Sequence, residues 1–535
     1  MRVASAARFT HGILAIALAL FASAATENSA EAHATLVRSE PADRVVVAQS
    51  PLSIELTFNE PVSLLALQLI GPNGETTALT GIMRAGASIA AKPSAVLTRG
   101  TYLVSWRVIS LDGHPVGSAL TFSVGAPSAT SVVPPPTEPD AVLRSAIWGI
   151  RLLFYVTVLC GIGGAFYAAW IAAGPLAREV RRLIAAALFC GIAAAVVSLA
   201  LQGIDASAAS LWDLRHPFPW LTGLSTSYGV TVGIALLAML AGLIALRRTS
   251  KPLSALALLA LGAALAASGH AAAAEPQLLT RPAVLLHGGA AAFWIGALVP
   301  LAAAMHCANP RNAELVRFSL AIPVGIGLLV ASGVVLAIVQ LRTIDALWTT
   351  DYGSILFRKL VLVTLLIGLA AVNRYALTPR IAEGDRIAAR RLTYAILLEL
   401  LIVFIVLGLV ATWRFTPPPR ALLAAAQAPL RIHIHGEQAM ADLTMEPTAA
   451  GGYRISVTVL DGRFAPLRAK EVTLVLAKPE AGLEPLRIPA TLIETVNWRI
   501  DHVRLPALGD CRLRVEILIS DFEKIELEDR IRLPR

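Results

Sequence analysis

The feature that most constrains this chain is a series of about eight apolar spans in its middle part, each roughly 20 residues long. The spans lie near residues 146–173, 183–203, 227–246, 253–268, 283–305, 320–340, 355–376 and 392–413. As a helix, a span of this length matches the hydrocarbon core of a bilayer. With 56% hydrophobic residues among 535 and a mean hydropathy of +0.67, the chain is too apolar for one soluble domain. We therefore predict a multi-domain membrane protein with a central bundle of about eight transmembrane helices.

The charges between the spans indicate the direction in which the helices run. If the segment before the first span lies outside, the inner loops are 177–182, 247–251, 306–317 and 377–391. Their basic residues are Arg178, Arg181, Arg182, Arg247, Arg248, Lys251, Arg311, Arg317, Arg380, Arg386, Arg390 and Arg391. The outer loops 204–226, 269–282 and 341–354 contain only Arg215, Arg281 and Arg342. Because basic residues favour the cytoplasmic side, the helix count and the orientation support each other.

The same basic clusters bear on the possible partners of the chain. Its net charge is +9 and its pI is about 9.7. The basic residues do not gather on one predicted soluble face but cluster in short segments between apolar runs. We therefore predict the cytoplasmic membrane as a partner and no nucleic acid.

The first 32 residues have the pattern of a secretory signal. Arg2 and Arg8 precede an apolar run at 13–22, and Ala30-Glu31-Ala32 provides a cleavage site. Cleavage after Ala32 would make His33 the N-terminus and would export the segment that follows to the periplasm.

Two segments that flank the bundle have a β-like pattern. In 33–125, residues 52–58 and 101–108 alternate and Pro72-Asn73-Gly74 predicts a turn, which favours a small β-sandwich or barrel. Residues 126–140, rich in Pro and Ser, form a predicted linker before the membrane domain at 141–415. In 420–535, the alternation at 453–460, 471–476 and 511–519 predicts a second sandwich, which an even number of spans places in the periplasm as well.

The exported N-terminus carries a candidate metal site. The free amine of His33 and its own imidazole can chelate one ion, while Asp112 and His114 are two residues apart and project to one side of an extended strand. Three nitrogens and one oxygen form a tetragonal set that favours Cu(II). Taken alone, Asp-Gly-His is more often a turn. The four cysteines, Cys160, Cys190, Cys307 and Cys511, form no disulfide framework and no CxxC motif.

Segment 33–125 resembles the CopC family of periplasmic copper-binding proteins. The resemblance lies in His33-Ala34-Thr35-Leu36, Ser39-Glu40-Pro41-Ala42, Phe58-Asn59-Glu60-Pro61, 102–106 and Asp112-Gly113-His114-Pro115. It implies that His33, Asp112 and His114 bind Cu(II), together with Glu60 as in some members of the family. A separate Cu(I) site in this family uses a Met-rich loop, whereas this segment has only Met83. One Cu(II) site and no Cu(I) site are therefore expected here.

The apolar region from about 146 to 413 resembles CopD, the membrane partner of CopC, and fusions of the two are a known arrangement. The resemblance lies in Ser268-Gly269-His270, Leu286-His287 and Phe293-Trp294-Ile295-Gly296. The predicted orientation places His270 and His287 on the periplasmic side, with His287 roughly 6 Å down its helix and Trp294 on the same face. The two histidines are candidates for a copper relay. The alternative for His270 is an interfacial histidine that is hydrogen-bonded to a loop. For Trp294, the alternatives are a place in an aromatic belt or a role in helix packing.

Three further residues are candidate site residues. Glu399, about seven residues into the last span, suits cation binding, proton relay or pairing with an Arg of a neighbouring helix, and the pairing ranks slightly ahead. In the tail, His433 and His435 alternate on a predicted strand, with Met440 and Met445 close behind. The tail resembles C-terminal domains of some CopC-CopD fusions. Two interpretations fit this pattern equally well. The histidines and methionines bind copper, or the two histidines are solvated residues of a surface strand.

The sequence favours an inner-membrane copper protein that binds Cu(II) in the periplasm and passes copper to its membrane domain for import, contributing to copper homeostasis and resistance. The alternative is a membrane-tethered periplasmic protein that sequesters copper without transport. No P-loop is evident, so an ATP-driven pump is not expected. An enzyme is not predicted, because paired histidines at matched depths, which haem would need, are not evident. The expected partners are copper ions, the membrane and periplasmic copper chaperones.

Overall fold

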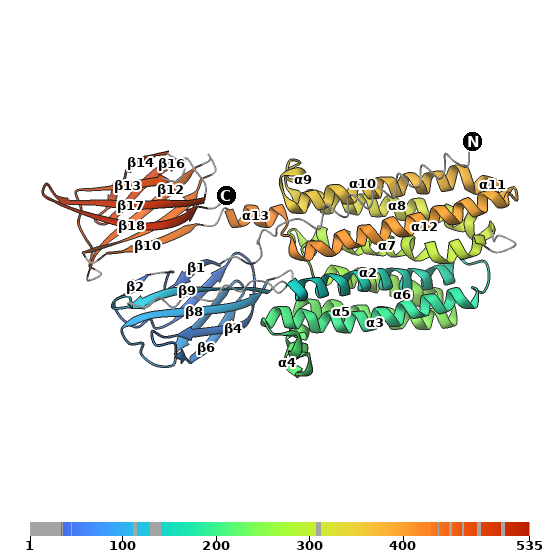
Figure 1. The fold of residues 1–535 in the computed structure, drawn as a ribbon, viewed down its shortest axis with the longest axis horizontal. Coiled ribbons are helices and arrows are strands. Elements are labelled where there is room, and N and C mark those ends of the chain that lie inside the picture. The colour runs from blue at the N-terminus through green and yellow to red at the C-terminus, as the bar shows by residue number, and fades with distance from the viewer. Residues whose placement is uncertain are drawn as a thin grey trace. The chain divides into compact units, whose positions relative to one another are not determined.

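The computed structural model describes most of the chain (Figure 1). The described residues are 34, 36–43, 45–110, 115–128, 141–306, 312–426, 429–436, 438–448, 452–462, 465–478, 483–503 and 509–533. The chain divides into a unit that contains the helices between residues 138 and 421 and a unit that contains the β-strands before and after them.

The N-terminal strands form two sheets around a shared apolar core. The strands are β1 (Leu36–Glu40), β2 (Val46–Val47), β3 (Ile54–Phe58), β4 (Ser63–Ile70), β5 (Thr76–Thr77), β6 (Leu79–Ala85), β7 (Ser88–Pro93), β8 (Gly100–Ile109) and β9 (Pro115–Val124). Their order is β1-β3-β7-β6 in one sheet and β2-β9-β8-β4-β5 in the other. Alternate residues such as Leu56 on β3 and Val104 on β8 enter one hydrophobic cluster. The predicted strands at 52–58 and 101–108 are thus confirmed as β3 and β8.

The C-terminal strands also form two sheets with a common core. They are β10 (Leu430–His435), β11 (Ala439–Pro447), β12 (Tyr453–Asp461), β13 (Glu471–Lys478), β14 (Leu483–Pro489), β15 (Thr491–Glu494), β16 (Asn497–Val503), β17 (Gly509–Ser520) and β18 (Glu523–Leu533). The orders are β10-β11-β12-β16-β15 and β14-β13-β17-β18. Val457 on β12 and Val515 on β17 lie in the same cluster. The strands predicted at 453–460, 471–476 and 511–519 are confirmed.

All eight predicted apolar spans are helical. The long helices are α2 (Ala141–Trp170), α3 (Arg178–Ser207), α5 (Ser227–Arg248), α6 (Lys251–Ala267), α7 (Gln277–His306), α8 (Asn312–Leu341), α10 (Asp351–Val372) and α12 (Arg386–Thr412). The short helices and helical turns are η1 (Leu211–Arg215), α4 (Pro217–Ser225), α9 (Ala346–Thr349), the π-helical turn η2 (Asn373–Leu377), α11 (Thr378–Ala382), η3 (Trp413–Phe415) and α13 (Pro419–Ala426). Within the described ranges, seven helices are long and apolar enough to cross a membrane, whereas α6 has only 17 residues.

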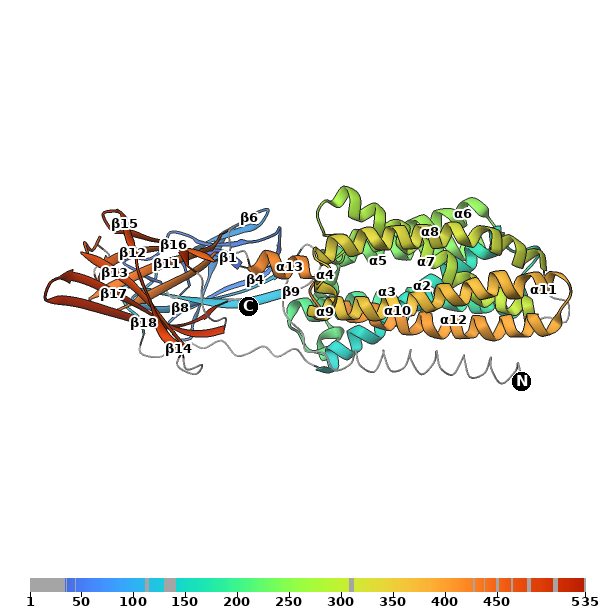
Figure 2. The same cartoon turned by 90° about the horizontal axis from the view of Figure 1, so that it is seen from above.

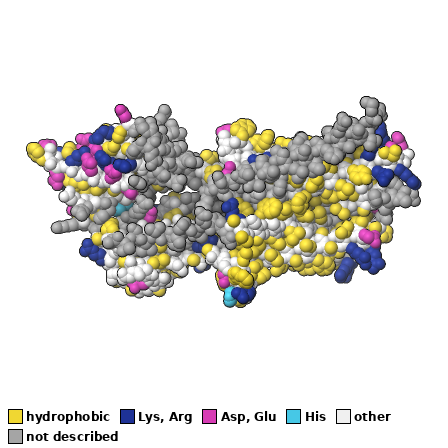
Figure 3. Space-filling model, viewed as in Figure 1, with side chains coloured by type: hydrophobic (Ala, Val, Ile, Leu, Met, Phe, Trp, Pro, Cys, Tyr) yellow, Lys and Arg dark blue, Asp and Glu magenta, His cyan; other side chains and the backbone are white. Residues whose placement is uncertain are grey.

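The helices run side by side as a bundle (Figure 2). Apolar side chains cover its flank, and Lys and Arg side chains gather toward its ends (Figure 3). On α8, Leu320, Val324 and Leu328 follow one another at four-residue spacing and are 71%, 67% and 42% exposed. A stripe of exposed leucine and valine on one helical face is the surface expected against lipid.

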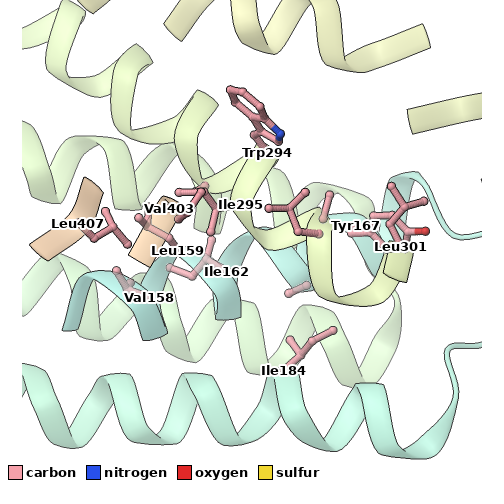
Figure 4. Packing of buried hydrophobic residues seen from close by; sticks show 14 of the residues in the cluster. Val158, Leu159, Ile162, Tyr167, Ile184, Trp294, Ile295, Leu301, Val403 and Leu407 are labelled. Carbon is pink, nitrogen blue, oxygen red and sulfur yellow. The ribbon is translucent and has the colours of Figure 1, made fainter. Parts of the chain in front are cut away.

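The centre of the bundle is closely packed. Figure 4 shows Ile295 of α7 directed toward Leu159 and Ile162 of α2, with Trp294 directed to another side of α7. Gly163 and Gly296 lie at the same crossing, where a Cβ on Gly163 would be 2.9 Å from the Cα of Gly296. Small residues therefore allow the backbones of α2 and α7 to approach closely.

Candidate metal centres

The pairing of the N-terminal strands brings several strand ends together at one end of the domain. Leu36 at the start of β1 pairs with Phe58 at the end of β3. Ser63, which begins β4 five residues later, pairs with Ile109 at the end of β8, and Ile109 pairs with Pro115 at the start of β9. The start of β1, the end of β3, the start of β4, the end of β8 and the start of β9 therefore lie at one end of the domain.

The predicted Cu(II) ligands belong to these segments. His33, Asp112 and His114 themselves lie outside the described residues. Glu60 is described and is half-buried at a bend in the segment that joins β3 to β4. Beside it, Phe58 packs edge-on against Trp106 with ring centroids 5.1 Å apart.

His270 is held in the segment between α6 and α7. Its side chain is 9% exposed, and its Nε2 donates to the backbone carbonyl of Trp413, 3.2 Å away. Its own carbonyl accepts hydrogen bonds from Gln340 Nε2 at 3.0 Å and Arg420 Nη2 at 2.9 Å. Since a carbonyl only accepts, the proton of a neutral His270 ring is on Nε2, and the lone pair is on Nδ1.

His287 has the complementary arrangement on α7. Its Nδ1 is 3.1 Å from the carbonyl oxygen of Leu329 and 3.2 Å from Ser332 Oγ, both on α8. The carbonyl fixes the proton on Nδ1, so the neutral ring has its lone pair on Nε2. Gly333 of α8 makes room for the ring, because a Cβ there would be 3.3 Å from His287 Cε1.

Helix α7 begins earlier than the sequence predicts. The sequence predicts a span that begins near residue 283, with His287 roughly 6 Å along it. The helix begins instead at Gln277, so His287 is about 15 Å along its axis. The first turn contains polar residues, which an apolar window does not include. Trp294 is 3% exposed and belongs to the hydrophobic core, in agreement with a packing role.

Glu399 is buried at 3% exposure and accepts a 2.8 Å hydrogen bond from Asn373 Nδ2. The partner on a neighbouring element is thus an amide, not the arginine that the pairing alternative predicts. Glu399 is also the middle residue of the 27-residue helix α12 and not one third of the way along it. The helix starts earlier than the apolar run because Asp385 caps it, accepting from the backbone N of Ile387 at 2.8 Å.

In the C-terminal domain, the register places the histidines beside one methionine. His433 pairs with Asp442 and His435 with Met440, whereas Met445 pairs with Leu430. Because facing residues share a sheet face and faces alternate, Met440 lies on the same face as His433 and Met445 lies on the core face. His433 is only 5% exposed, so it is not the solvated surface residue of the second alternative. Its Nδ1 is 2.6 Å from Asp442 Oδ1.

Sequence reasoning missed three polar residues at these sites: Gln340, Arg420 and Asn373. Arg420 Nε donates a hydrogen bond to Gln340 Oε1 at 3.0 Å. Both residues also donate to the backbone carbonyl of His270. A polar residue at the end of an apolar span was the available signal for Gln340. In the part of the chain that the structure describes, no group of three or more His, Cys, Asp or Glu side chains is placed to hold a metal ion. Among these residues, His270 and His287 therefore belong to no group of three or more such ligands.

Comparison with known proteins is consistent with this arrangement. The family model of the CopC domain matches residues 36–125. The model of the copper resistance protein D-like N-terminal domain matches residues 142–280, and that of copper resistance protein D matches residues 312–413.

Three relatives cover different parts of the chain. Copper transport protein CutJ of Bacillus subtilis is 24% identical and aligns with 93% of this chain and 95% of its own length. Copper resistance protein D of Pseudomonas syringae pv. tomato is 29% identical over 50% of this chain and 96% of its own length. Copper resistance protein C of Xanthomonas campestris pv. juglandis is 33% identical over 22% of this chain and 98% of its own length.

Proposed function

The chain belongs to the family of CopC-CopD fusions, and from this premise we propose that it binds Cu(II) in the periplasm and passes copper to its membrane domain for import. This activity would contribute to copper homeostasis and resistance. Membership in a copper resistance and transport family supports copper as the ion.

The observation that carries the proposal is the bonding of His270 and His287. Each imidazole donates one ring N–H to a backbone carbonyl, Trp413 for His270 and Leu329 for His287. Metal-binding histidines typically have such a partner, because it fixes the tautomer and orients the other nitrogen toward the metal. Two singly placed ligands suit transient binding and release more than permanent retention. They are therefore proposed as successive positions of a copper relay.

Copper would enter this path from the N-terminal domain. We assign its Cu(II) site to the amine and imidazole of His33 with Asp112 and His114, and with Glu60 as an additional ligand. The described strand ends that flank these residues lie together at one end of the domain, which supports this set. These ligands give a tetragonal nitrogen-oxygen set that favours Cu(II). The two sheets of this domain are proposed to form a β-sandwich.

The charges and α6 support the proposed orientation. A helix of 17 residues is about 25 Å long and falls within the range that crosses a membrane. With α6 counted, eight helices cross and both β-domains lie in the periplasm, which agrees with the basic inner loops. His433 and His435 of the C-terminal domain are proposed as an accessory copper position, supported by the carboxylate of Asp442 on His433.

The test is copper accumulation in cells that express the full chain. His287→Ala and His270→Ala should each reduce cytoplasmic copper several-fold. His216→Ala, which removes an exposed histidine before α4, is the matched control and should leave accumulation unchanged. If cytoplasmic copper is the same with and without the protein while periplasmic copper rises, the protein sequesters copper and the import proposal is wrong.

The N-terminal site needs a separate test. One residue added before His33 moves the α-amine away from the imidazole and should weaken Cu(II) binding to the mature protein, measured by spectroscopic titration. Undiminished Cu(II) affinity would refute the amine as a ligand.

A further inference from the structure

Glu399 occupies an unusual position for a carboxyl group. It is the middle residue of α12 and is 3% exposed inside the helical bundle. An ionised carboxylate in such a place is costly unless a cation or a proton neutralises it. What surrounds Glu399 therefore determines which of the two it takes.

The hydrogen-bond partner of Glu399 is the amide of Asn373. Asn373 is 8% exposed and begins the π-helical turn η2, a type of distortion that occurs frequently at functional sites. Its Nδ2 donates to Glu399 Oε1 at 2.8 Å, and its Oδ1 is buried without a hydrogen-bond partner among the described atoms. An amide can donate to a carboxylate and, after rotation by 180°, accept from a carboxylic acid. Arginine could only donate and would favour the ionised form.

Titratable groups occur on several of the elements packed against α12. The elements packed against α12 are α2, α7, α10, η2, α11 and η3. Their titratable side chains along the bundle include Tyr155, Cys160, Tyr167, His287, Lys359, Arg374 and Arg380. Within the described residues, the Glu399 carboxyl is 3% exposed and accepts its hydrogen bond from the Asn373 amide.

Two basic residues on these elements have partners other than Glu399. Lys359 Nζ lies 4.9 Å from the centre of the Trp413 ring. Arg374, one residue after Asn373, donates from Nη1 to Ser319 Oγ on α8 at 2.8 Å. Neither cation is hydrogen-bonded to Glu399, and among the described residues no ion pair joins Glu399 to a basic side chain.

We infer that Glu399 and Asn373 form a proton-exchange site that compensates the charge of copper crossing the bundle. Glu399 is protonated when the bundle is empty. A copper cation in the bundle replaces the proton as the compensating positive charge. The carboxylate then releases H⁺ to the side from which copper enters and takes up H⁺ from the side to which copper leaves. Asn373 stabilises both forms by rotation of its amide. The inference rests on the proposed copper transport and adds counter-movement of protons to it.

The experiment uses the full-length protein in liposomes that contain a pH-sensitive dye and no copper. Copper is added outside, and internal copper and internal pH are followed together. For the wild-type protein, copper uptake should be accompanied by a rise in internal pH, and an acidic interior should accelerate uptake several-fold. Glu399→Gln should abolish both effects, because glutamine exchanges no proton, whereas Glu399→Asp should retain the pH response.

Glu314→Gln is the matched control. Glu314 is also fully buried, but its carboxylate accepts from Tyr167 Oη at 2.8 Å and from the backbone N of Ala173 at 3.2 Å, which marks it as a structural anchor. This variant should keep the coupling to pH.

The outcomes separate the two proposals. If wild-type liposomes take up no copper, the transport proposal fails and this inference fails with it. If copper enters without a change of pH, or if Glu399→Gln keeps the pH response, the proton-exchange site is refuted while transport stands.

Discussion

Gly163→Ala tests the close approach of α2 and α7 in the helical bundle. A Cβ on Gly163 would overlap the carbonyl oxygen of Ala292 and lie 2.7 Å from its carbonyl carbon. Because the obstacle is backbone, no rotamer change relieves the overlap, and the helices must separate by about 1 Å. Overpacking of this kind costs about 3 kcal/mol, against a gain of about 1 kcal/mol in helix propensity.

Gly149→Ala is the matched control for this prediction. Gly149 is on the same helix, α2, but a Cβ there meets no described heavy atom within 4 Å. The substitution gains helix propensity without a clash. The two variants should therefore differ by about 3 kcal/mol, or about 6–12 °C in the unfolding midpoint of the helical domain.

The assay is thermal unfolding of the purified protein in detergent, with copper uptake measured in parallel. Gly163→Ala should lower the midpoint and reduce uptake, since α7 carries His287. Gly296→Ala, on the other side of the crossing, should have a similar effect. Equal midpoints for Gly163→Ala and Gly149→Ala would refute the backbone contact between the two helices.

Two further predictions concern ion pairs. Arg414→Met should destabilise the helical domain by about 2 kcal/mol in the same unfolding assay. The substitution removes the ion-pair partner of Asp205, whose side chain is 27% exposed. An unchanged midpoint would contradict this prediction. Burial tends to raise the pKa of Glu516, but hydrogen bonds from Lys524 and Arg487 outweigh burial and hold that pKa below its usual range. This stabilisation should be present at neutral pH and lost as the pH falls through the folded-state pKa. Hydrogen exchange of β13 and β17 should therefore show a larger loss of protection on acidification in the wild-type protein than in Glu516→Gln, and equal losses would count against it.

The sequence predicted the elements because hydropathy and alternation report local burial. Each apolar span is helical, and β3, β8, β12, β13 and β17 lie at the alternating segments. The helix ends were less predictable, since polar first turns extend a helix beyond its apolar run. Arg386 begins α12 and Gln277 begins α7 for this reason. Because of these earlier starts, Glu399 lies at the middle of α12, and His287 lies further along α7 than the apolar runs predict.

The site was predictable only as far as single residues allow. His270, His287 and Glu399 stand out because polar residues in apolar spans are costly. Their partners could not be predicted, because they are distant in the chain. Arg420 is 150 residues from His270, and Asn373 is 26 residues from Glu399. Tertiary packing alone determines these contacts.

The α10–α12 pair connects the candidate copper position with the proton-exchange site. Trp413, directly after α12, provides the carbonyl that binds His270, and Lys359 of α10 lies over the ring of the same residue. Further along the pair, Glu399 of α12 is bonded to Asn373, directly after α10. A shift of α12 against α10 would therefore alter both contacts at once, because each helix is rigid and contributes to both. Copper at His270 and protonation of Glu399 can then bias the same movement, which is the physical requirement for coupling between the two sites.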